Sequence, residues 1–116
     1  MDGKFIICCV LFATILPCYE QFGFGGSSEP LYSFKDVGIT LVDYSNFTHT
    51  ILQSENAWMV EFYSSWCGHC IRFAPIYKEL GQAVQGWQSM IKLAAIDCAQ
   101  DVNTGICRDY EIMVRI

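Results

Sequence analysis

The spacing of apolar residues changes along the chain, and the changes predict three strands. Residues 57–63, AWMVEFY, are almost continuously apolar, and residues 91–96, IKLAAI, show a second such run. Short continuous runs are typical of strands that are covered on both faces. A shorter run at residues 39–42 is rich in β-branched side chains and predicts a third strand.

Between these runs, apolar residues recur every three or four positions, which predicts helices facing a core. The longest predicted helix begins near Cys67. Its apolar stripe comprises Phe73, Tyr77, Leu80, Val84 and Trp87. Pro75 lies inside this helix and should kink it. Asp43 should cap a shorter helix that buries Phe47, Ile51 and Leu52. A last helix within residues 102–112 should bury Ile106, Tyr110 and Ile112. Alternating strands and helices predict an α/β fold with a central sheet flanked by helices.

The amino-terminal residues have a different character. Residues 5–16, FIICCVLFATIL, carry no charge, but about twelve residues are too few to cross a bilayer core of ~30 Å as a helix. They predict a signal peptide at residues 1–20, cleaved somewhere near 18–23, although an uncleaved anchor or a buried segment would also fit. Residues 21–30 contain FGFGGSS and predict a flexible lead-in, which leaves residues 31–116 for the folded domain.

Composition narrows the class of protein. A chain of 116 residues, 53% apolar and 16% charged, has room for one packed domain. The net charge is −5 and no cluster of Lys and Arg exists, so we expect no nucleic-acid partner. Of the seven cysteines, two lie inside the predicted signal peptide and Cys18 lies at its edge. The remaining four form an even set, which in the oxidising secretory pathway indicates disulfides.

Trp66-Cys67-Gly68-His69-Cys70 lies where a predicted strand passes into a predicted helix. Unpaired N–H groups and the helix dipole favour a thiolate at such a place, and Cys-x-x-Cys motifs have pKa values lowered from ~8.5 to roughly 3.5–7.5. We predict that Cys67 and Cys70 form a redox-active disulfide, with Cys67 exposed as the attacking residue and Cys70 more buried as the resolving one.

His69 lies between the two cysteines, and Trp66 lies just before them. An imidazole near the sulfurs should stabilise the reduced pair, so the couple should be more oxidising than one with proline at this position. A structural zinc site would need four ligands, and no second Cys-x-x-Cys exists, so we expect no metal. An inert Cys67–Cys70 disulfide remains an alternative to a redox-active one.

Glu61 is the only charged residue in the apolar run 57–63. A buried carboxyl should have a raised pKa, and beneath Cys70 it would accept that thiol's proton during exchange. The alternative is a partly exposed acid at the edge of the sheet.

Three further residues suggest modifications. Cys98 and Cys107 would close a ten-residue loop as a structural disulfide worth roughly 2.5–3 kcal/mol. Asn46 begins the triplet Asn-Phe-Thr, a sequon for N-glycosylation, although it would also serve to start the helix there.

These motifs together resemble a known family. VEFYSSWCGHC at residues 60–70 resembles protein disulfide isomerases and quiescin sulfhydryl oxidases. LAAIDCAQDVNTGICRDYEI is more similar to the first thioredoxin domain of quiescin sulfhydryl oxidases. Disulfide isomerases usually have lysine where Ala95 stands, facing the buried acid. The resemblance covers residues 31–112 and implies a thioredoxin-like fold, with the roles given above for Cys67, Cys70, Glu61 and the Cys98–Cys107 bridge.

The resemblance also implies a reaction. In that family, electrons from reduced secretory proteins pass through the first pair to FAD and oxygen, which yields hydrogen peroxide. The family continues after residue 112 into a Gly-Phe-Pro-Thr-like loop and later a flavin domain. The sequence ends at Ile116, so we expect a C-terminally incomplete domain, with the FAD site outside this chain and a sheet edge left unpaired. The expected location is the endoplasmic reticulum, the Golgi and the extracellular space, with a membrane anchor only in a longer isoform.

Two other functions remain open at this point. The chain could be a disulfide isomerase-like protein that needs no flavin, or an inactive truncated product.

Overall fold

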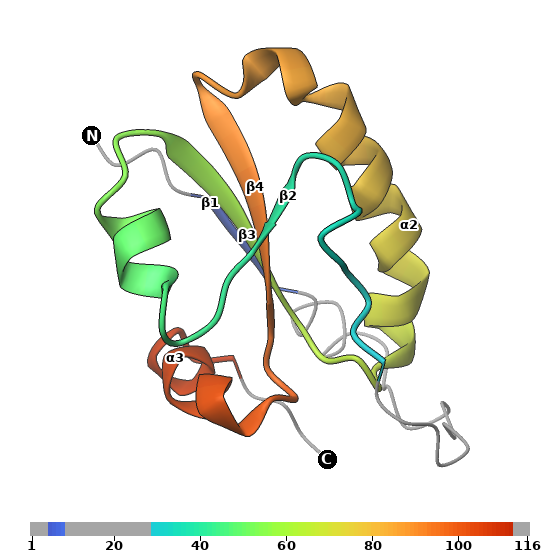
Figure 1. Ribbon diagram of the computed structural model, residues 1–116. Coiled ribbons are helices and arrows are strands. Elements are labelled where there is room, and N and C mark those ends of the chain that lie inside the picture. Colours follow the sequence, from blue (N-terminus) through green and yellow to red (C-terminus); the bar gives the residue numbers. More distant parts are fainter. Residues whose placement is uncertain (1–4, 9–28, 113–116) are drawn as a thin grey trace.

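The computed structural model describes residues 5–8 and 29–112 and contains a sheet with helices on both faces (Figure 1). The four strands are β1 (Phe5–Cys8), β2 (Ile39–Leu41), β3 (Ala57–Tyr63) and β4 (Ile91–Asp97). The two α-helices are α2 (Gly68–Ala83) and α3 (Thr104–Asp109). Three shorter helical segments are the π-helix η2 (Thr48–Leu52) and the 3-10 helices η3 (Gln85–Trp87) and η4 (Asp101–Asn103).

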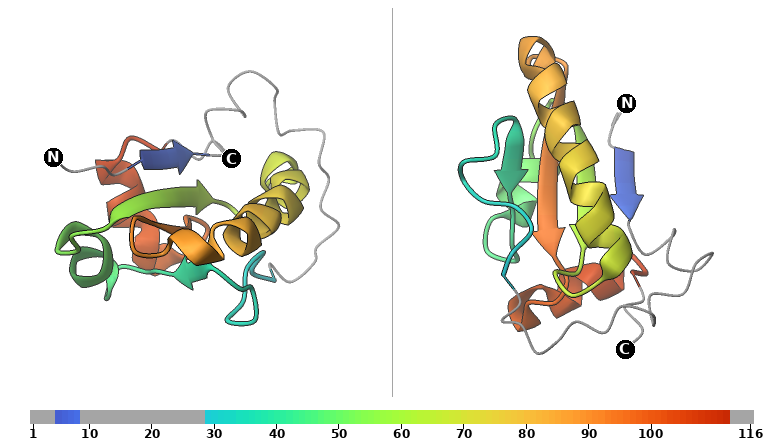
Figure 2. Two further views of the ribbon diagram at one scale, coloured as in Figure 1. Left: turned by 90° about the horizontal axis from the view of Figure 1, so that it is seen from above. Right: turned by 90° about the vertical axis from the view of Figure 1, so that its right-hand side faces the viewer.

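The strands form one parallel sheet in the order β1-β3-β4-β2. The central strands β3 and β4 pair over their whole length, from Ala57 opposite Ile91 to Tyr63 opposite Asp97. Figure 2 shows β1 and β2 at opposite edges, with α2 in front of the sheet in the right-hand view and η2 behind it. The predicted α/β architecture with a central sheet is therefore confirmed.

Side-chain alternation along the strands separates two buried clusters, one on each face of the sheet. Trp58, Val60 and Phe62 of β3 belong to the cluster that packs against η2 and α3. Met59 and Tyr63 belong to the second cluster, with residues of α2. Glu61 has the parity of the second set, so the strand period places this carboxyl beneath α2, the helix that begins with the cysteine motif.

Gly38, just before β2, and Gly81 of α2 allow the backbones of these two elements to lie close together. Gly38 has a φ of +83°, and a Cβ added there would lie 2.1 Å from the carbonyl oxygen of Gly81 in α2. A side chain at Gly38 would therefore force the edge strand and the helix apart, besides straining the backbone.

The predicted helices differ from the observed ones at their ends. The short helix after Asp43 begins only at Thr48, because the Asp43 carboxylate accepts from the backbone and hydroxyl of Ser45 rather than capping the helix. Ile51 of this helix is buried as predicted, but Leu52 is 45% exposed. Trp87 was predicted to lie on the buried face of the longest helix, but it is 59% exposed. Helix α2 ends at Ala83, so Trp87 lies in η3 and not on the apolar face of α2.

Strand β1 was not predicted. Residues 5–8 lie within the expected signal peptide, and in the structure they pair with β3 from Phe5 opposite Met59 to Cys8 opposite Phe62. An unpaired sheet edge was expected, and along these residues β1 occupies one edge of β3. The cleavage region at 18–23 and most of the predicted lead-in lie outside the described residues.

None of the helices within the described ranges combines the length and apolar character that crossing a membrane requires.

Candidate functional site

The cysteine motif occupies the junction between β3 and α2, as the sequence predicted. After β3 the chain turns through Ser64, whose carbonyl accepts from the backbone N–H of Cys67 at 3.0 Å. Cys67 is the N-cap of α2, with an extended backbone, and no side chain caps this helix end. The Cys67 carbonyl accepts from Ile71 at 2.9 Å, which closes the first helical turn. The first N–H groups of α2 have no acceptor within the helix, so they favour negative charge beside Cys67.

Both cysteines of the motif are buried. Cys70 is 1% exposed and Cys67 is 5% exposed. The expected order of burial is found, but the expectation that Cys67 is exposed is wrong. Its side chain packs in the cluster beneath α2, beside Tyr63 and Ala74. Trp66, the preceding residue, is 38% exposed and is the part of the motif that faces solvent.

His69 lies on the first turn of α2, and Arg72 one turn later binds it. The guanidinium Nη2 lies 2.9 Å from Nδ1 of His69, and because arginine only donates, Nδ1 accepts. Arg72 was not predicted as a site residue, although its i+3 spacing from His69 is the signal that could have indicated it.

Glu61 is fully buried, with 0% exposure, in the interior strand β3. The interpretation as a buried acid is therefore confirmed, and the alternative of a partly exposed edge residue is wrong. Its partner in the register of β4 is Ala95, which carries no charge. The hydroxyl of Tyr32 donates a hydrogen bond to Oε2 of Glu61.

The pKa of Tyr63 responds to both the buried acid and the cysteine motif. Burial, followed by the charges of Asp97 and Glu61, raises the pKa of the Tyr63 phenol above its ordinary value, and Cys70 adds to the effect. Glu61 and Cys70 therefore both lie within electrostatic range of one phenol. The structure brings the predicted acid and the predicted resolving cysteine into the same buried region.

The two other predicted sites lie elsewhere. The sulfurs of Cys98 and Cys107 are joined in a disulfide with a Cα–Cα distance of 6.0 Å, and this bond ties the end of β4 to α3. Asn46 is partly buried, and its Oδ1 accepts from the backbone N–H of Asp43 at 2.9 Å. Its local role in the turn is thus visible, while glycosylation remains a prediction.

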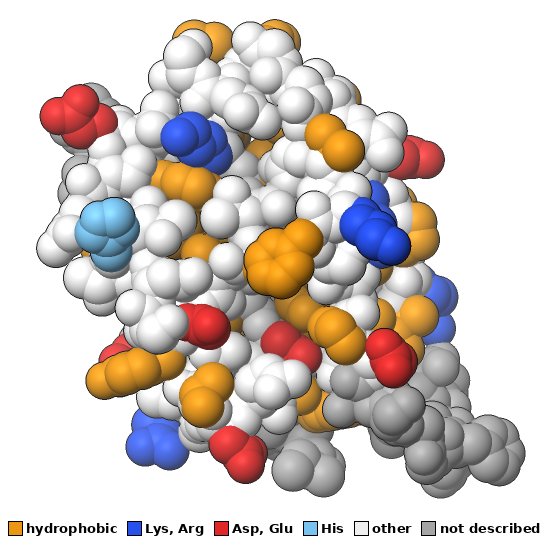
Figure 3. Space-filling model, viewed as in Figure 1, with side chains coloured by type: hydrophobic (Ala, Val, Ile, Leu, Met, Phe, Trp, Pro, Cys, Tyr) orange, Lys and Arg blue, Asp and Glu red, His pale blue; other side chains and the backbone are white. Residues whose placement is uncertain are grey.

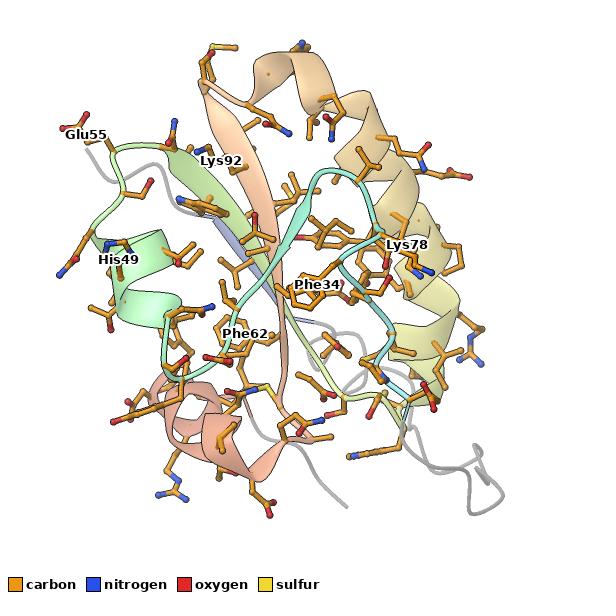
Figure 4. All side chains as sticks on the ribbon, in the orientation of Figure 1. Phe34, His49, Glu55, Phe62, Lys78 and Lys92 are labelled. Carbon is orange, nitrogen blue, oxygen red and sulfur yellow. A yellow bond between two sulfur atoms is a disulfide. The ribbon has the colours of Figure 1, made fainter. Side chains whose placement is uncertain are left out.

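A cavity formed by the described residues lies away from the redox pair. This cavity of about 510 Å³ is lined by residues of β2, η2 and the beginnings of β3 and β4, among them Trp58, His49 and Lys92. Figure 4 shows His49 and Lys92 projecting from separate elements on this side of the sheet. No residue of 61–70 lines the cavity, so a flavin placed there would not contact Cys67 or Cys70. Within the described part of the chain, no three His, Cys, Asp or Glu side chains are grouped as metal ligands.

Comparison with known proteins agrees with this geometry. The sequence profile of the thioredoxin family matches residues 38–114. Mouse sulfhydryl oxidase 1 is 48% identical over 82 residues, which cover 71% of this chain and 11% of the mouse protein. Human sulfhydryl oxidase 1 is 46% identical over 91 residues, covering 76% of this chain and 12% of that protein. Human sulfhydryl oxidase 2 is 40% identical over 90 residues, covering 78% and 13%.

The chain spans about one eighth of the length of these relatives. The matched region contains the β3–α2 junction and both cysteines of the motif. The chain therefore belongs to the thioredoxin family, and at this junction it carries the Cys-x-x-Cys pair of a thiol–disulfide oxidoreductase.

Proposed function

We propose that this chain is the substrate-oxidising module of a sulfhydryl oxidase and introduces disulfides into proteins of the secretory pathway. The observation that carries the proposal is the position of Cys67 at the start of α2, with Cys70 one turn later above a buried carboxylate. The similarity to sulfhydryl oxidases 1 and 2 supports this direction of the reaction.

The chemistry begins with the Cys67–Cys70 pair oxidised. A substrate thiolate attacks the sulfur of Cys67, a mixed disulfide forms, and Cys70 leaves as a thiolate that takes up a proton. A second substrate thiolate then attacks the substrate sulfur of the mixed disulfide. The substrate leaves with a new disulfide, and the pair remains reduced. Two electrons have passed from the substrate to Cys67 and Cys70.

Reoxidation needs a disulfide acceptor. When the reduced pair meets such an acceptor, Cys67 attacks it, and Cys70 gives up its proton and displaces the acceptor from Cys67. In sulfhydryl oxidases that acceptor is a distant cysteine pair beside FAD. No step is assigned to a flavin here.

Reduced or unfolded secretory proteins with free thiols are the proposed substrates. Exposed apolar side chains near the motif, Trp66 and Ile71, would contact such chains. On the face drawn in Figure 3, hydrophobic side chains gather over the centre of the molecule, and Figure 4 places Phe34, which is 95% exposed, in this area. The proposed location is the secretory pathway and the extracellular space.

A thiol-exchange assay on the full chain tests this function. The oxidised chain should oxidise a dithiol peptide with one peptide disulfide formed per chain and without oxygen uptake. Cys67→Ser should abolish the reaction, and Cys70→Ser, offered the disulfide form of the peptide in place of the dithiol, should form a mixed disulfide at Cys67 that is not resolved. The Cys98–Cys107 bond should remain intact and serve as an internal control. Equal oxidation by Cys67→Ser and the unaltered chain would contradict the proposal, and no exchange by a folded chain would favour an inactive product.

A flavin-independent isomerase is the second candidate, because the thioredoxin profile matches residues 38–114 and thiol–disulfide exchange by Cys67 and Cys70 consumes no cofactor. Rearrangement of a mispaired peptide at a rate well above its net oxidation would support this alternative.

A further inference from the structure

We propose that Tyr32 is a positioning residue that holds the Glu61 carboxylate ready to accept the proton of Cys70. This inference rests on the proposed function, since it concerns the step in which Cys70 displaces a partner from Cys67. Its structural basis is independent of that function. Tyr32 and Glu61 are 29 positions apart in the sequence, and their hydroxyl–carboxylate contact is buried.

The surroundings of Tyr32 fix its ring. Tyr32 is 1% exposed and packs edge-on against Tyr63 and Tyr77, with ring centroids 5.0 and 5.8 Å away. The ammonium of Lys78 lies 5.6 Å from the centre of the Tyr32 ring and also pairs with Asp36 at 3.5 Å. Figure 4 shows Lys78 projecting from α2 toward the segment that precedes β2. Because the ring is packed on several sides, the Tyr32 hydroxyl is held in one orientation, toward the Glu61 carboxylate.

The hydrogen bond has a definite electrostatic consequence. Burial at 0% exposure disfavours the ionised form of Glu61, and the facing residue of β4, Ala95, supplies no positive charge. A hydrogen bond donated to Oε2 favours the ionised form. Tyr32 therefore opposes the effect of burial and keeps the carboxylate able to accept a proton.

The proton passes from the Cys70 thiol to the Glu61 carboxylate before the new disulfide forms. In the mixed disulfide, the Cys70 thiol gives its proton to the Glu61 carboxylate, and the resulting thiolate attacks the sulfur of Cys67. The Cys67–Cys70 bond forms, the bond from Cys67 to the partner breaks, and the partner leaves as a thiolate. The reverse step returns the proton from Glu61 to Cys70. Other charged or titratable groups packed around this region are Tyr63, Cys67, Tyr77, Lys78 and Asp97.

The kinetic test uses an aromatic disulfide whose two released thiolates absorb light. The first release reports attack by Cys67, and the second reports displacement by Cys70. Tyr32→Phe should leave the first phase within about twofold and slow the second about tenfold near neutral pH, with recovery as the pH rises. In a Glu61→Gln background, Tyr32→Phe should add no further effect on the second phase, because Tyr32 acts through Glu61.

Tyr77→Phe is the matched control. It also removes a buried phenol hydroxyl beneath α2, one that lies 2.9 Å from the carbonyl oxygens of Met59 and Ala94. A general loss of packing or stability should affect both variants, whereas a pH shift of the second phase should be confined to Tyr32→Phe. An equal slowing by Tyr32→Phe at every pH, or the same factor in the Glu61→Gln background, would overturn the proposal.

A titration separates this inference from the proposed function. In the full chain with labelled glutamate, the carbon signal of the Glu61 carboxyl should titrate about one pH unit higher in Tyr32→Phe than in the unaltered protein. An unchanged midpoint overturns the role of Tyr32, whether or not exchange occurs. Should Tyr32→Phe not fold, the hydroxyl proton of Tyr32 gives a second readout. It should be protected and far downfield in the unaltered chain and move upfield in Glu61→Gln, and an unmoved signal would overturn the proposal.

Discussion

Two carboxylates, Asp43 and Glu61, show how burial changes what a hydrogen bond does. The hydrogen bond from the Ser45 hydroxyl holds the pKa of Asp43 below its usual value against the opposing effect of burial, and the backbone N–H groups of Ser45 and Asn46 add to the lowering. Glu61 is fully enclosed, so its bond from Tyr32 acts against a much larger desolvation cost. The first carboxylate shapes a turn, whereas the second is the group that we propose accepts the proton of Cys70.

Asp43 gives a prediction about pH and stability. Because its pKa is lowered on folding, its charge stabilises the native state above the unfolded value of 3.8, and this stabilisation is lost as the pH falls through the folded pKa. Asp43→Asn keeps an acceptor without the charge and should lower the free energy of unfolding at pH 7 by about 0.5 kcal/mol, as expected for an exposed group. Denaturant unfolding at several pH values should show this difference shrinking below pH 4. A constant difference down to pH 2 would contradict the account.

The sequence predicted some site residues better than others, for a physical reason. Glu61 was recognisable because a single charge in an apolar strand must be buried or at an edge. Tyr32 was not, because nothing in its own neighbourhood indicates a partner 29 residues away. The exposure of Cys67 was also mispredicted, since local sequence does not show how closely the cluster beneath α2 encloses a residue at the helix start.

At the scale of elements, the central strands followed their pattern closely. Strand β3 has the bounds that its apolar run predicted, and β4 extends the predicted run by one residue. Strands buried on both faces leave a strong signal, which explains this agreement. Helix η2 began later than expected because Asp43 is engaged by Ser45. Strand β1 was missed because an uncharged run near the amino terminus fits a signal peptide as well as a strand.

The pairing of β1 gives a prediction about β3. If residues 1–20 are removed as a signal peptide, the edge of β3 facing β1 loses its hydrogen-bond partners. Amide hydrogen exchange should then be faster at alternate positions of residues 59–62 in a chain of residues 21–116 than in the full chain. Amides of β4, which pairs with β3 and β2 in both chains, provide the control. Equal protection of β3 in both chains would contradict the described pairing.

At the scale of the whole molecule, the fold positions chemistry at one end of a parallel sheet. The sheet delivers β3 to the start of α2, and the alternation of side chains along β3 places Glu61 and Tyr63 under that helix. The opposite face is packed by η2 and α3, with the Cys98–Cys107 disulfide tying α3 to the end of β4. One face therefore supports redox chemistry and the other provides structural support.

The pH dependence of Cys67 alkylation, measured in the reduced full chain by peptide mass analysis, tests the central claim most directly. The midpoint is the informative quantity, because Cys67 is only 5% exposed and burial limits the absolute rate. The start of α2 should lower the pKa of Cys67 below the ~8.5 of a cysteine in the denatured chain. A midpoint at or above the denatured value would show that no thiolate is stabilised at this junction and would contradict the assignment of Cys67 as the attacking residue.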